Sequence, residues 1–401
     1  MKPSSLKINY NSLSSELCEI GKKYDTDKSS QRSNVTNARH CHPYTLFYDA
    51  LFKSKRNDAL IIAELGILEG SSLRMWQEYF PNAEIHGYEY NQQFIDSFRQ
   101  QYDNKNITID FIDVGNVDSI TSAFREKQYD IIIEDTTHQF EDQVRVIQNT
   151  WKNVKPGGIM IIEDIFKRYH ENDYITRLQD ILPNFQNYYF VELDHVNRNS
   201  TGWDNDKLFI LVKGGAEPLF KNENKITIIT PSYRVNNLVK LKESINFDYV
   251  DEWIIVYDGK KVTENPHLFE GQSKIKEFIF TGDGISGNDQ RNYALTHISK
   301  GMLYFLDDDN IIHPDLYNLL NIVQPGIFYS FNQINAEGKV RIKGNNINIG
   351  SIDTAMVLVP YTTEQWIPSK YDADGHYIKA CHSKFPWIYV NNELCYYNKV
   401  S

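Results

Sequence analysis

Acidic residues and one histidine follow two apolar runs, in positions where side chains can do chemistry. The segment DIIIEDTTH carries Asp135 and His138, and the segment PGGIMIIEDI carries Glu163 and Asp164. Ligand sites in open parallel sheets form beyond the carboxyl ends of strands, so these two tips are expected to converge. Three carboxylates suit a hard divalent ion such as Mg²⁺, and His138 is then the candidate general base. The alternative for any single acid is a solvated strand end.

A glycine turn precedes these acids. ELGILEG (64–70) predicts a strand that runs through Gly66 and Gly70 into a helix over 71–79. The glycines let the backbone approach a ligand, and the helix start offers free N–H groups. Glu89, at the end of the next strand, can accept hydrogen bonds from both hydroxyls of a ribose. GxGxxG is absent, which disfavours NAD; the pattern favours an adenosyl ligand, with a plain tight turn as the alternative.

A second set of strand ends lies further along the chain. KITIITPSYR (225–234) ends in a proline turn, EWIIVYD (252–258) in one acid, and GMLYFLDDDN (301–310) in three. Such carboxylates can hold Mn²⁺ or Mg²⁺ that bridges the phosphates of a nucleoside diphosphate. With 53 acids in 401 residues, a triplet alone is expected about once by chance, so its position after an apolar run carries the argument. No Lys or Arg is close to the triplet in sequence, which also favours a cation.

The elements that position these groups follow a βα alternation. Short apolar runs alternate with amphipathic stretches from about residue 59, which is typical of a mostly parallel sheet. Strands are predicted at 60–65, 84–88, 108–112, 129–133 and 158–162, and 188–193 and 207–212 are predicted to form a closing antiparallel pair. After 213–224 the alternation restarts at 225–230, 252–257, 276–280 and 302–306. A helix is predicted at 44–53.

This organisation predicts two tandem α/β domains. Residues 1–58 are interpreted as a cap, 59–212 as the first domain core and 225–401 as the second domain. The segment KGGAEPLFKNEN (213–224), with two Gly, a Pro and polar residues, is interpreted as the linker.

Composition restricts the function classes. Lys plus Arg is 42 and Asp plus Glu is 53, a formal charge of −11, so there is no bulk electrostatic reason to bind nucleic acid or an anionic membrane. Apolar residues are 41% and charged residues 24%, as in globular proteins. The four cysteines show no CxxC spacing and fit reduced thiols in a cytoplasmic chain. No stretch is long and apolar enough to predict a membrane span or a signal peptide.

Several motifs together resemble the metal-dependent sugar O-methyltransferases typified by macrocin O-methyltransferase. They are EIGKKYDTDKSS…HPYTLFYDALF (19–52), ELGILEGSSLRMWQEYFPNAEIHGYEYN (64–91), EDTTH and PGGIMIIEDI, and the resemblance covers about 15–212. It implies a class I methyltransferase fold, with a seven-stranded Rossmann-like sheet, that binds S-adenosylmethionine and Mg²⁺. It assigns cofactor binding to Glu64, Gly66, Gly70 and Glu89, metal binding to Asp135, Glu163 and Asp164, and the base to His138. Asp113 is assigned to the adenine pocket, although IDVGN departs from the GDQ-like motif of the family.

The second domain resembles the GT-A glycosyltransferases, both the inverting family 2 enzymes and the animal glucuronosyltransferases. QRNYAL (290–295) precedes GMLYFLDDDN at a similar spacing, and the resemblance covers about 225–401. It implies a nucleotide-sugar donor, with a UDP-sugar as the first expectation, and Mn²⁺ or Mg²⁺ at Asp309. The base of an inverting transfer is expected at Asp374 of YDADG, with Asp372 as second choice and an Asp-Gly turn as the alternative. The remaining donor-binding positions are Thr230, Pro231, Tyr233, Asp258, Arg291, Asp307 and Asp308.

These patterns predict a bifunctional enzyme of glycan biosynthesis, which transfers a sugar to a saccharide acceptor and O-methylates a sugar hydroxyl. One alternative is a single activity beside a degenerate carbohydrate-binding module. Another is a small-molecule O-methyltransferase with a fused scaffold domain. Self-association into a homo-oligomer is left open. Binding of S-adenosylmethionine and of a panel of nucleotide-sugars separates these hypotheses.

Overall fold

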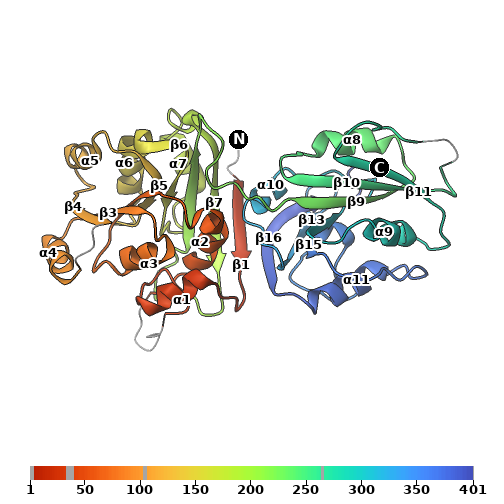
Figure 1. The fold of residues 1–401 in the computed structure, drawn as a ribbon, viewed down its shortest axis with the longest axis horizontal. Coiled ribbons are helices and arrows are strands. Elements are labelled where there is room, and N and C mark those ends of the chain that lie inside the picture. The colour runs from red at the N-terminus through yellow and green to blue at the C-terminus, as the bar shows by residue number, and fades with distance from the viewer. Residues whose placement is uncertain (1–3, 33–39, 103–105, 263–265, 401) are drawn as a thin grey trace. The chain divides into compact units, whose positions relative to one another are not determined.

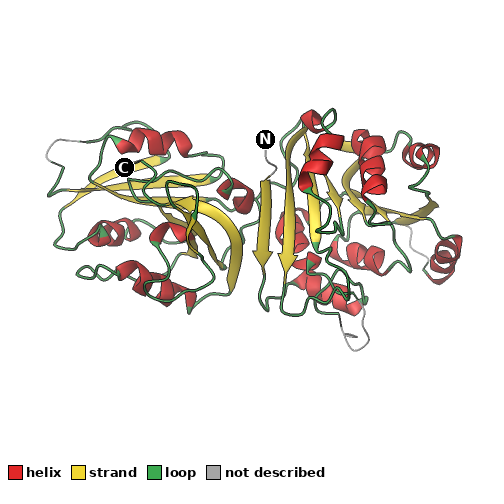
Figure 2. Ribbon diagram, turned by 180° about the vertical axis from the view of Figure 1, so that it is seen from behind, coloured by secondary structure: helices red, strands yellow, loops and turns green. Residues whose placement is uncertain are grey.

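The protein consists of two compact α/β units. The computed structural model describes residues 4–32, 40–102, 106–262 and 266–400. One unit spans Met1–Lys221 and the other Asn222–Ser401, so the division falls inside the segment 213–224 that the sequence marks as a linker. In each unit helices lie on both faces of a sheet (Figure 2).

The first unit contains a mostly parallel sheet in the order β4-β3-β2-β5-β6-β8-β7-β1 (Figure 1). Strands β4 to β6 run parallel, whereas β8 is antiparallel to both β6 and β7. The parallel sheet and its closing antiparallel pair, both predicted from the sequence, are confirmed. The strands are β1 (Ser4–Asn9), β2 (Ile61–Leu65), β3 (Glu84–Glu89), β4 (Ile107–Phe111), β5 (Tyr129–Glu134), β6 (Val154–Ile162), β7 (Phe185–Asp194) and β8 (Lys207–Lys213).

The N-terminal segment adds an eighth strand to the seven that were expected. Strand β1 pairs in parallel with β7, so the described part of the unit has eight strands, and residues 1–58 do more than cover the domain. The sequence SSLKIN offers only Leu6 and Ile8 as apolar residues, both almost completely buried. Two alternating apolar positions are too few to mark a strand by periodicity.

Seven α-helices lie within the described residues of this unit. Helix α3 begins directly after Gly70, whose φ of 77° ends the turn that follows β2. It covers the residues that the sequence predicts, and the helix predicted at 44–53 is present as α2. The helices are α1 (Glu16–Lys23), α2 (Tyr44–Phe52), α3 (Ser71–Tyr79), α4 (Gln92–Gln101), α5 (Val117–Phe124), α6 (Phe140–Thr150) and α7 (Glu171–Arg177), with short 3₁₀ turns at Lys53–Lys55, Trp151–Asn153 and Leu182–Asn184.

The core of this unit fixes the strand ends. Every residue of β5 is buried, and Phe190 on β7 pairs in register with Phe209 on β8. These two rings stack with centroids 4.2 Å apart, a contact worth about 0.5–1.5 kcal/mol beyond its buried area. The acidic residues that follow β5 and β6 are therefore carried by rigid strands.

The second unit contains a mixed sheet in the order β11-β10-β9-β12-β15-β13-β16, with β14 paired to β13. Strands β11, β10, β9 and β12 are parallel, β15 is antiparallel to its neighbours, and β13 and β16 are parallel. The strands are β9 (Ile226–Ser232), β10 (Val250–Asp258), β11 (Ile275–Phe280), β12 (Met302–Phe305), β13 (Phe328–Ile334), β14 (Val340–Ile342), β15 (Val357–Pro360) and β16 (Trp387–Tyr396). The helices are α8 (Asn237–Ser244), α9 (Asn288–Leu295), α10 (Leu316–Leu320) and α11 (Ala373–His382), with a 3₁₀ turn at Thr354–Met356.

Within the described residues, no helix combines the length and the apolar character that a membrane crossing requires.

Candidate active site

A cavity of about 700 Å³ lies beyond the strand ends of the first unit. Segments that follow β2, β3, β4, β5 and β6 all contribute to its wall, as expected for a ligand site of an open parallel sheet. The N-terminal segment and the β7–β8 connection complete the wall. The lining residues used below are Lys28, His40, His42, Gly66, Leu68, Glu89, Asp113, Asp135, His138, Asp164, Trp203 and Asn205.

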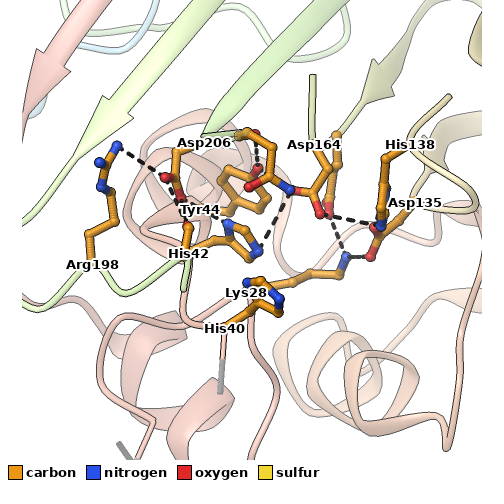
Figure 3. A network of polar contacts seen from close by, with 12 residues as sticks. Lys28, His40, His42, Tyr44, Asp135, His138, Asp164, Arg198 and Asp206 are labelled. Carbon is orange, nitrogen blue, oxygen red and sulfur yellow. Dashed lines mark hydrogen bonds and ion pairs between the residues drawn. The ribbon is translucent and has the colours of Figure 1, made fainter. Parts of the chain in front are cut away.

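Asp135, His138 and Asp164 form a group whose ligand atoms lie within 4.8 Å of one another. His138 Nδ1 is 3.8 Å from Asp135 Oδ1, and His138 Nε2 is 3.6 Å from Asp164 Oδ2 (Figure 3). His138 Nδ1 is buried and has no hydrogen-bond partner among the described residues. The two carboxylates offer oxygen ligands that fit a hard divalent ion, and the imidazole nitrogen beside them is left without a protein partner.

The backbone at two of these residues is unusual. His138 has a φ of 58° and Asp164 a φ of 55°, both in the left-handed region. Residues other than glycine rarely adopt this region, although Asp and His do so more readily than most. Strained backbone conformations cluster at functional sites, where the strain places a side chain in the direction that the site requires.

Lys28 lies at the centre of the acidic cluster. Its side chain is 2% exposed, and Nζ lies 2.5 Å from Asp135 Oδ2, 2.5 Å from Glu163 Oε2 and 3.3 Å from Glu64 Oε1. Burial alone would lower the pKa of Lys28, but the three carboxylates raise it well above its ordinary value. The ammonium therefore stays charged and compensates buried negative charge.

Glu163 is placed differently from the other predicted metal ligands. Its Oε2 accepts a hydrogen bond from Lys28, and its Oε1 accepts one from the Tyr48 hydroxyl at 2.5 Å. Burial raises the pKa of Glu163 well above the ordinary value, and Lys28 acts against that rise. Both oxygens thus have protein partners inside the unit.

A second charged pair supports Asp164. His42 Nδ1 is 2.8 Å from Asp206 Oδ1, and His42 Nε2 is 3.7 Å from Asp164 Oδ1 (Figure 3). Burial opposes the charge on His42, but Asp164 and Asp206 outweigh it and raise its pKa to about 10. The Tyr44 hydroxyl donates to Asp164 Oδ1 as well. Asp164 is therefore held by a neutral donor and by an imidazolium.

The predicted cofactor residue Glu89 lines the cavity, but its carboxylate also has backbone partners. Oε2 accepts hydrogen bonds from the N–H groups of Ile67 and Leu68, and Oε1 accepts those of Tyr90 and Asn91. Glu89 therefore fixes the turn after β2 against the end of β3.

The two glycines of this turn are required by protein neighbours. A Cβ at Gly66 would lie 1.9 Å from the Asp135 carbonyl oxygen, and a Cβ at Gly70 would lie 2.3 Å from the Phe98 ring. The space that their missing side chains leave is thus filled by the segment after β5 and by Phe98 of α4. Gly66 also lines the cavity. Because its backbone lies so close to that of Asp135, the turn after β2 packs directly against a candidate metal ligand.

The two other predicted cofactor residues differ in exposure. Glu64 is completely buried beside Lys28, and burial raises its pKa. Asp113 lines the cavity, and its Oδ1 accepts the N–H of Gly115 at 2.9 Å. Of these two residues, only Asp113 is thus open toward a ligand.

In the second unit, the Asp triplet lies beside two arginines. Arg234 Nη1 is 2.6 Å from Asp308 Oδ1 and 3.1 Å from Asp309 Oδ2, and Arg291 pairs with Asp307. No Lys or Arg is close to the triplet in the sequence, but the fold brings two arginines into contact with it. Arg234 lies in the turn after β9, which pairs with β12, and Arg291 lies in α9. The local sequence does not show that either arginine meets the triplet.

The three acids of the triplet have different surroundings. Asp308 is 2% exposed and accepts the N–H groups of Tyr233 and Arg234, so it holds the turn after β9. Burial, with the charge of Asp307, raises the pKa of Asp309 to about 6. Burial also raises the pKa of Asp307, against the effect of Arg291.

The other predicted donor-binding residues range from core to surface. Thr230 is buried and its hydroxyl accepts a hydrogen bond from Trp253 Nε1, which is a core contact. Pro231 is also buried, within β9. Tyr233 is 44% exposed, and the Lys261 ammonium lies 4.0 Å from its ring centroid. Asp258 ends β10 and accepts the N–H of Lys260.

The two candidate bases lie at the start of α11. Asp372 is the residue before the helix, and Asp374 is in its first turn, so the alternative of an Asp-Gly turn is wrong. Burial raises the pKa of Asp374, and the charge of Asp353 adds to the effect. Asp353 was not singled out by the sequence.

Residues that sequence reasoning left without a role also line or support the first cavity. Lys28 belongs to the DTDK motif, and His42 to the HPY motif. Asp206 and Trp203 come from the segment GWDNDK, which carries no recognisable pattern. An acid and a lysine next to one another are ordinary surface composition, so only long-range contacts reveal their function.

The strand order of the first unit corresponds to a known fold. Its Rossmann-like sheet is that of the class I S-adenosylmethionine-dependent methyltransferases, and residues 70–206 match the family model described as a methyltransferase domain.

Among characterised proteins, the unit is similar to the mycinamicin VI 2''-O-methyltransferase of Micromonospora griseorubida and to the demethylmacrocin O-methyltransferase of Streptomyces fradiae. Each is 29% identical, over 156 and 155 residues, which is 37% of this chain and 38% of the relative. The chain thus matches well under half the length of these relatives. A solved structure of the MycE methyltransferase with Mg and SAH aligns at 21% identity and a TM-score of 0.38, over 52% of this chain and 58% of that one.

Proposed function

We propose that the first unit transfers a methyl group from S-adenosylmethionine to a sugar hydroxyl, with the help of a divalent ion such as Mg²⁺. The observation that carries this proposal is the group Asp135–His138–Asp164 on the wall of a 700 Å³ cavity beyond the strand ends of a methyltransferase-type sheet. The similarity to these two O-methyltransferases, and to the 8-demethyl-8-alpha-L-rhamnosyl tetracenomycin-C 2'-O-methyltransferase of Streptomyces olivaceus, whose name includes a rhamnosyl group, supports the substrate class.

In this proposal Asp135 and Asp164 hold the ion. Their carboxylates face His138 from both sides, and the unpartnered His138 Nδ1 supports the presence of a further polar group at this site. Glu163, the third ligand expected from the sequence, is supported better as the partner of Lys28 and Tyr48. When bound, the ion supplies positive charge that lowers the pKa of an acceptor hydroxyl.

His138 is the general base in this mechanism. Neither ring nitrogen makes a hydrogen bond to the flanking carboxylates, because the distances are 3.6 and 3.8 Å, so the ring is available to take a proton. The acceptor oxygen attacks the methyl carbon, the carbon–sulfur bond breaks, and the hydroxyl proton passes to His138. Lys28 keeps the buried acids compensated while His138 gains positive charge. Asp113 and the turn after β2 hold the nucleoside part of the methyl donor.

The test combines binding with turnover in the full chain. S-adenosylhomocysteine is expected to bind, and methyl transfer to a glycoside is expected to require added Mg²⁺. The Asp135→Ala variant is expected to lose transfer and keep nucleoside binding. Full transfer in excess chelator would contradict the proposal.

For the second unit we propose transfer of a sugar from a nucleotide-sugar donor, a UDP-sugar first, to a saccharide acceptor with inversion. The observation in favour is the convergence of Arg234, Arg291 and the Asp triplet beyond two parallel strands. Asp309 is the proposed ligand for Mn²⁺ or Mg²⁺, and Arg291 and Asp307 are proposed to contact the donor. The two arginines weaken the argument for an obligatory metal, because they can also neutralise a leaving diphosphate.

Two alternatives predict different outcomes. If the second unit only binds carbohydrate, no UDP-, GDP- or dTDP-sugar binds and free glycans do. If the first unit methylates small catechols, a catechol replaces the glycoside as the acceptor. Titration of the full chain with these probes distinguishes the three functions.

A further inference from the structure

One side of the cavity carries an exposed aromatic surface beside the proposed base. Trp203 lies in the connection between β7 and β8, is 44% exposed and lines the cavity. Its ring centroid is 6.0 Å from that of His138 and 5.4 Å from that of Phe166. An indole left open at a cavity wall provides a broad apolar face with low conformational freedom, which suits a flat ligand surface.

Buried polar atoms without partners lie at the same wall. Asn205 is 1% exposed and lines the cavity, yet its Oδ1 has no hydrogen-bond partner among the described residues. His40, whose ring centroid is 5.0 Å from that of Trp203, has a buried Nδ1 with the same property. A buried polar atom without a partner costs free energy, so these two atoms favour a ligand that supplies the missing hydrogen bonds.

The segment that carries Trp203 is firmly attached. Asp206, which is completely buried, accepts hydrogen bonds from the Ser200 hydroxyl at 2.9 and 3.0 Å and pairs with Arg198 and His42 (Figure 3). The backbone of Asn199 exchanges two hydrogen bonds with that of Cys41. The backbone on both sides of Trp203 is therefore anchored by hydrogen bonds and ion pairs.

We propose that Trp203, His40 and Asn205 form the acceptor subsite and receive a neutral hexopyranose. The apolar C–H face of the sugar lies on the indole, Asn205 and His40 bond its hydroxyls, and a further hydroxyl reaches His138. Acidic side chains outnumber Lys and Arg in the cavity lining, so a sugar that carries a carboxylate is disfavoured. This proposal rests on the function proposed for the first unit and adds the residues that select its acceptor.

The test measures acceptor binding without turnover. The full chain, saturated with S-adenosylhomocysteine and Mg²⁺, is titrated with methyl α-L-rhamnopyranoside, methyl β-D-glucopyranoside, methyl β-D-glucuronide and catechol, with tryptophan fluorescence and saturation-transfer NMR as readouts. A neutral glycoside is expected to bind more tightly than the glucuronide and to quench fluorescence. Trp203→Ala is expected to weaken glycoside binding at least tenfold, Trp203→Phe less, and Asn205→Ala about tenfold.

Control variants separate this proposal from damage to the fold and from the proposed function. Trp151→Phe removes a tryptophan outside the cavity and is expected to leave both binding and quenching unchanged. S-adenosylhomocysteine affinity is expected to stay the same in every variant, which a merely structural role of Trp203 would not predict. Equal glycoside affinity in wild type and Trp203→Ala overturns the subsite alone. Binding of catechol with no glycoside binding overturns the proposed function as well.

Discussion

Lys28 Nζ lies 2.5 Å from Glu163 Oε2, although 135 positions separate the two residues, and both side chains are almost completely buried. Since the same ammonium also contacts Asp135 and Glu64, the net charge of this buried cluster depends on one lysine. A solvent-exposed ion pair contributes little to the free energy of unfolding, whereas a buried charge without a partner lowers it strongly.

Replacement of Lys28 by Met is therefore expected to destabilise the first unit by roughly 3–5 kcal/mol, because it leaves buried carboxylates without their cation. Urea unfolding followed by tryptophan fluorescence measures the effect. Lys23→Met, which removes an exposed ion pair with Glu78, is the matched control and should leave the unfolding midpoint unchanged. Similar midpoints for the two variants would mean that Lys28 does not compensate the cluster.

The two neighbouring acids after β6 are expected to respond differently to substitution. Asp164→Asn should weaken Mg²⁺ binding at least tenfold, because it removes a proposed ligand. Glu163→Gln should change Mg²⁺ affinity much less and lower the unfolding midpoint, because both oxygens of Glu163 have protein partners. Calorimetric titration with Mg²⁺ decides between them. A tenfold loss of Mg²⁺ affinity in the Glu163→Gln variant would instead identify Glu163 as a metal ligand.

His138→Ala is expected to lower kcat about 10²–10⁴-fold, the usual contribution of a positioned base. Affinities for S-adenosylhomocysteine and Mg²⁺ should stay unchanged. Steady-state kinetics and a calorimetric titration of the same sample provide the measurements. A parallel loss of Mg²⁺ affinity would identify His138 as a ligand instead of the base.

Asp49 provides a test of pH-dependent stability away from the cavity. Burial raises the pKa of this acid, and the Tyr79 hydroxyl, which donates to it at 3.0 Å, limits the rise. A raised acid pKa costs stability once the pH exceeds the ordinary value, and the whole cost is present above the folded-state pKa. Asp49→Asn, which keeps the acceptor for Tyr79, should raise Tm by a few degrees at pH 7 and give no gain near pH 3.5. Melting curves across this range would contradict the argument if the gain did not vary with pH.

Asp374→Asn is expected to abolish sugar transfer by the second unit and to leave nucleotide-sugar binding intact, because it removes a basic oxygen and little volume. Asp372→Asn is the paired variant, since it changes an acid two positions away at the start of the same helix. NMR of the product checks inversion at the anomeric carbon. Normal transfer by the first variant and none by the second would assign the base to Asp372.

The sequence predicts what depends on short-range pattern. Apolar runs locate most strands to within a few residues, and the parallel topology that they imply brings Asp135 and Asp164 together at one sheet edge. The later strands β13 and β16 were not predicted, because polar residues such as Asn332 interrupt them and their register shifts. A bulged strand loses the strict alternation that reveals it.

Contacts between distant segments are what the sequence does not predict. Lys28 and Asp135 lie 107 positions apart, and Arg234 and Asp308 lie 74 apart. A charged residue in a polar stretch looks the same whether it ends at the surface or beneath a sheet edge. Only the packing of the whole unit distinguishes these cases. In each unit it brings a basic side chain, Lys28 or Arg234, into contact with the acids of the candidate site.

Strand β1 has a consequence for the order in which the molecule can form. Ser4 pairs with Tyr189, so the first described strand of this unit cannot pair until one of the last strands of the same unit has been made. At roughly 5–20 residues per second, translation keeps Leu6 and Ile8 unpaired for at least several seconds. We therefore expect the N-terminal segment to be the last to dock during synthesis, and a bulky fusion placed directly before Ser4 to slow maturation of the first unit.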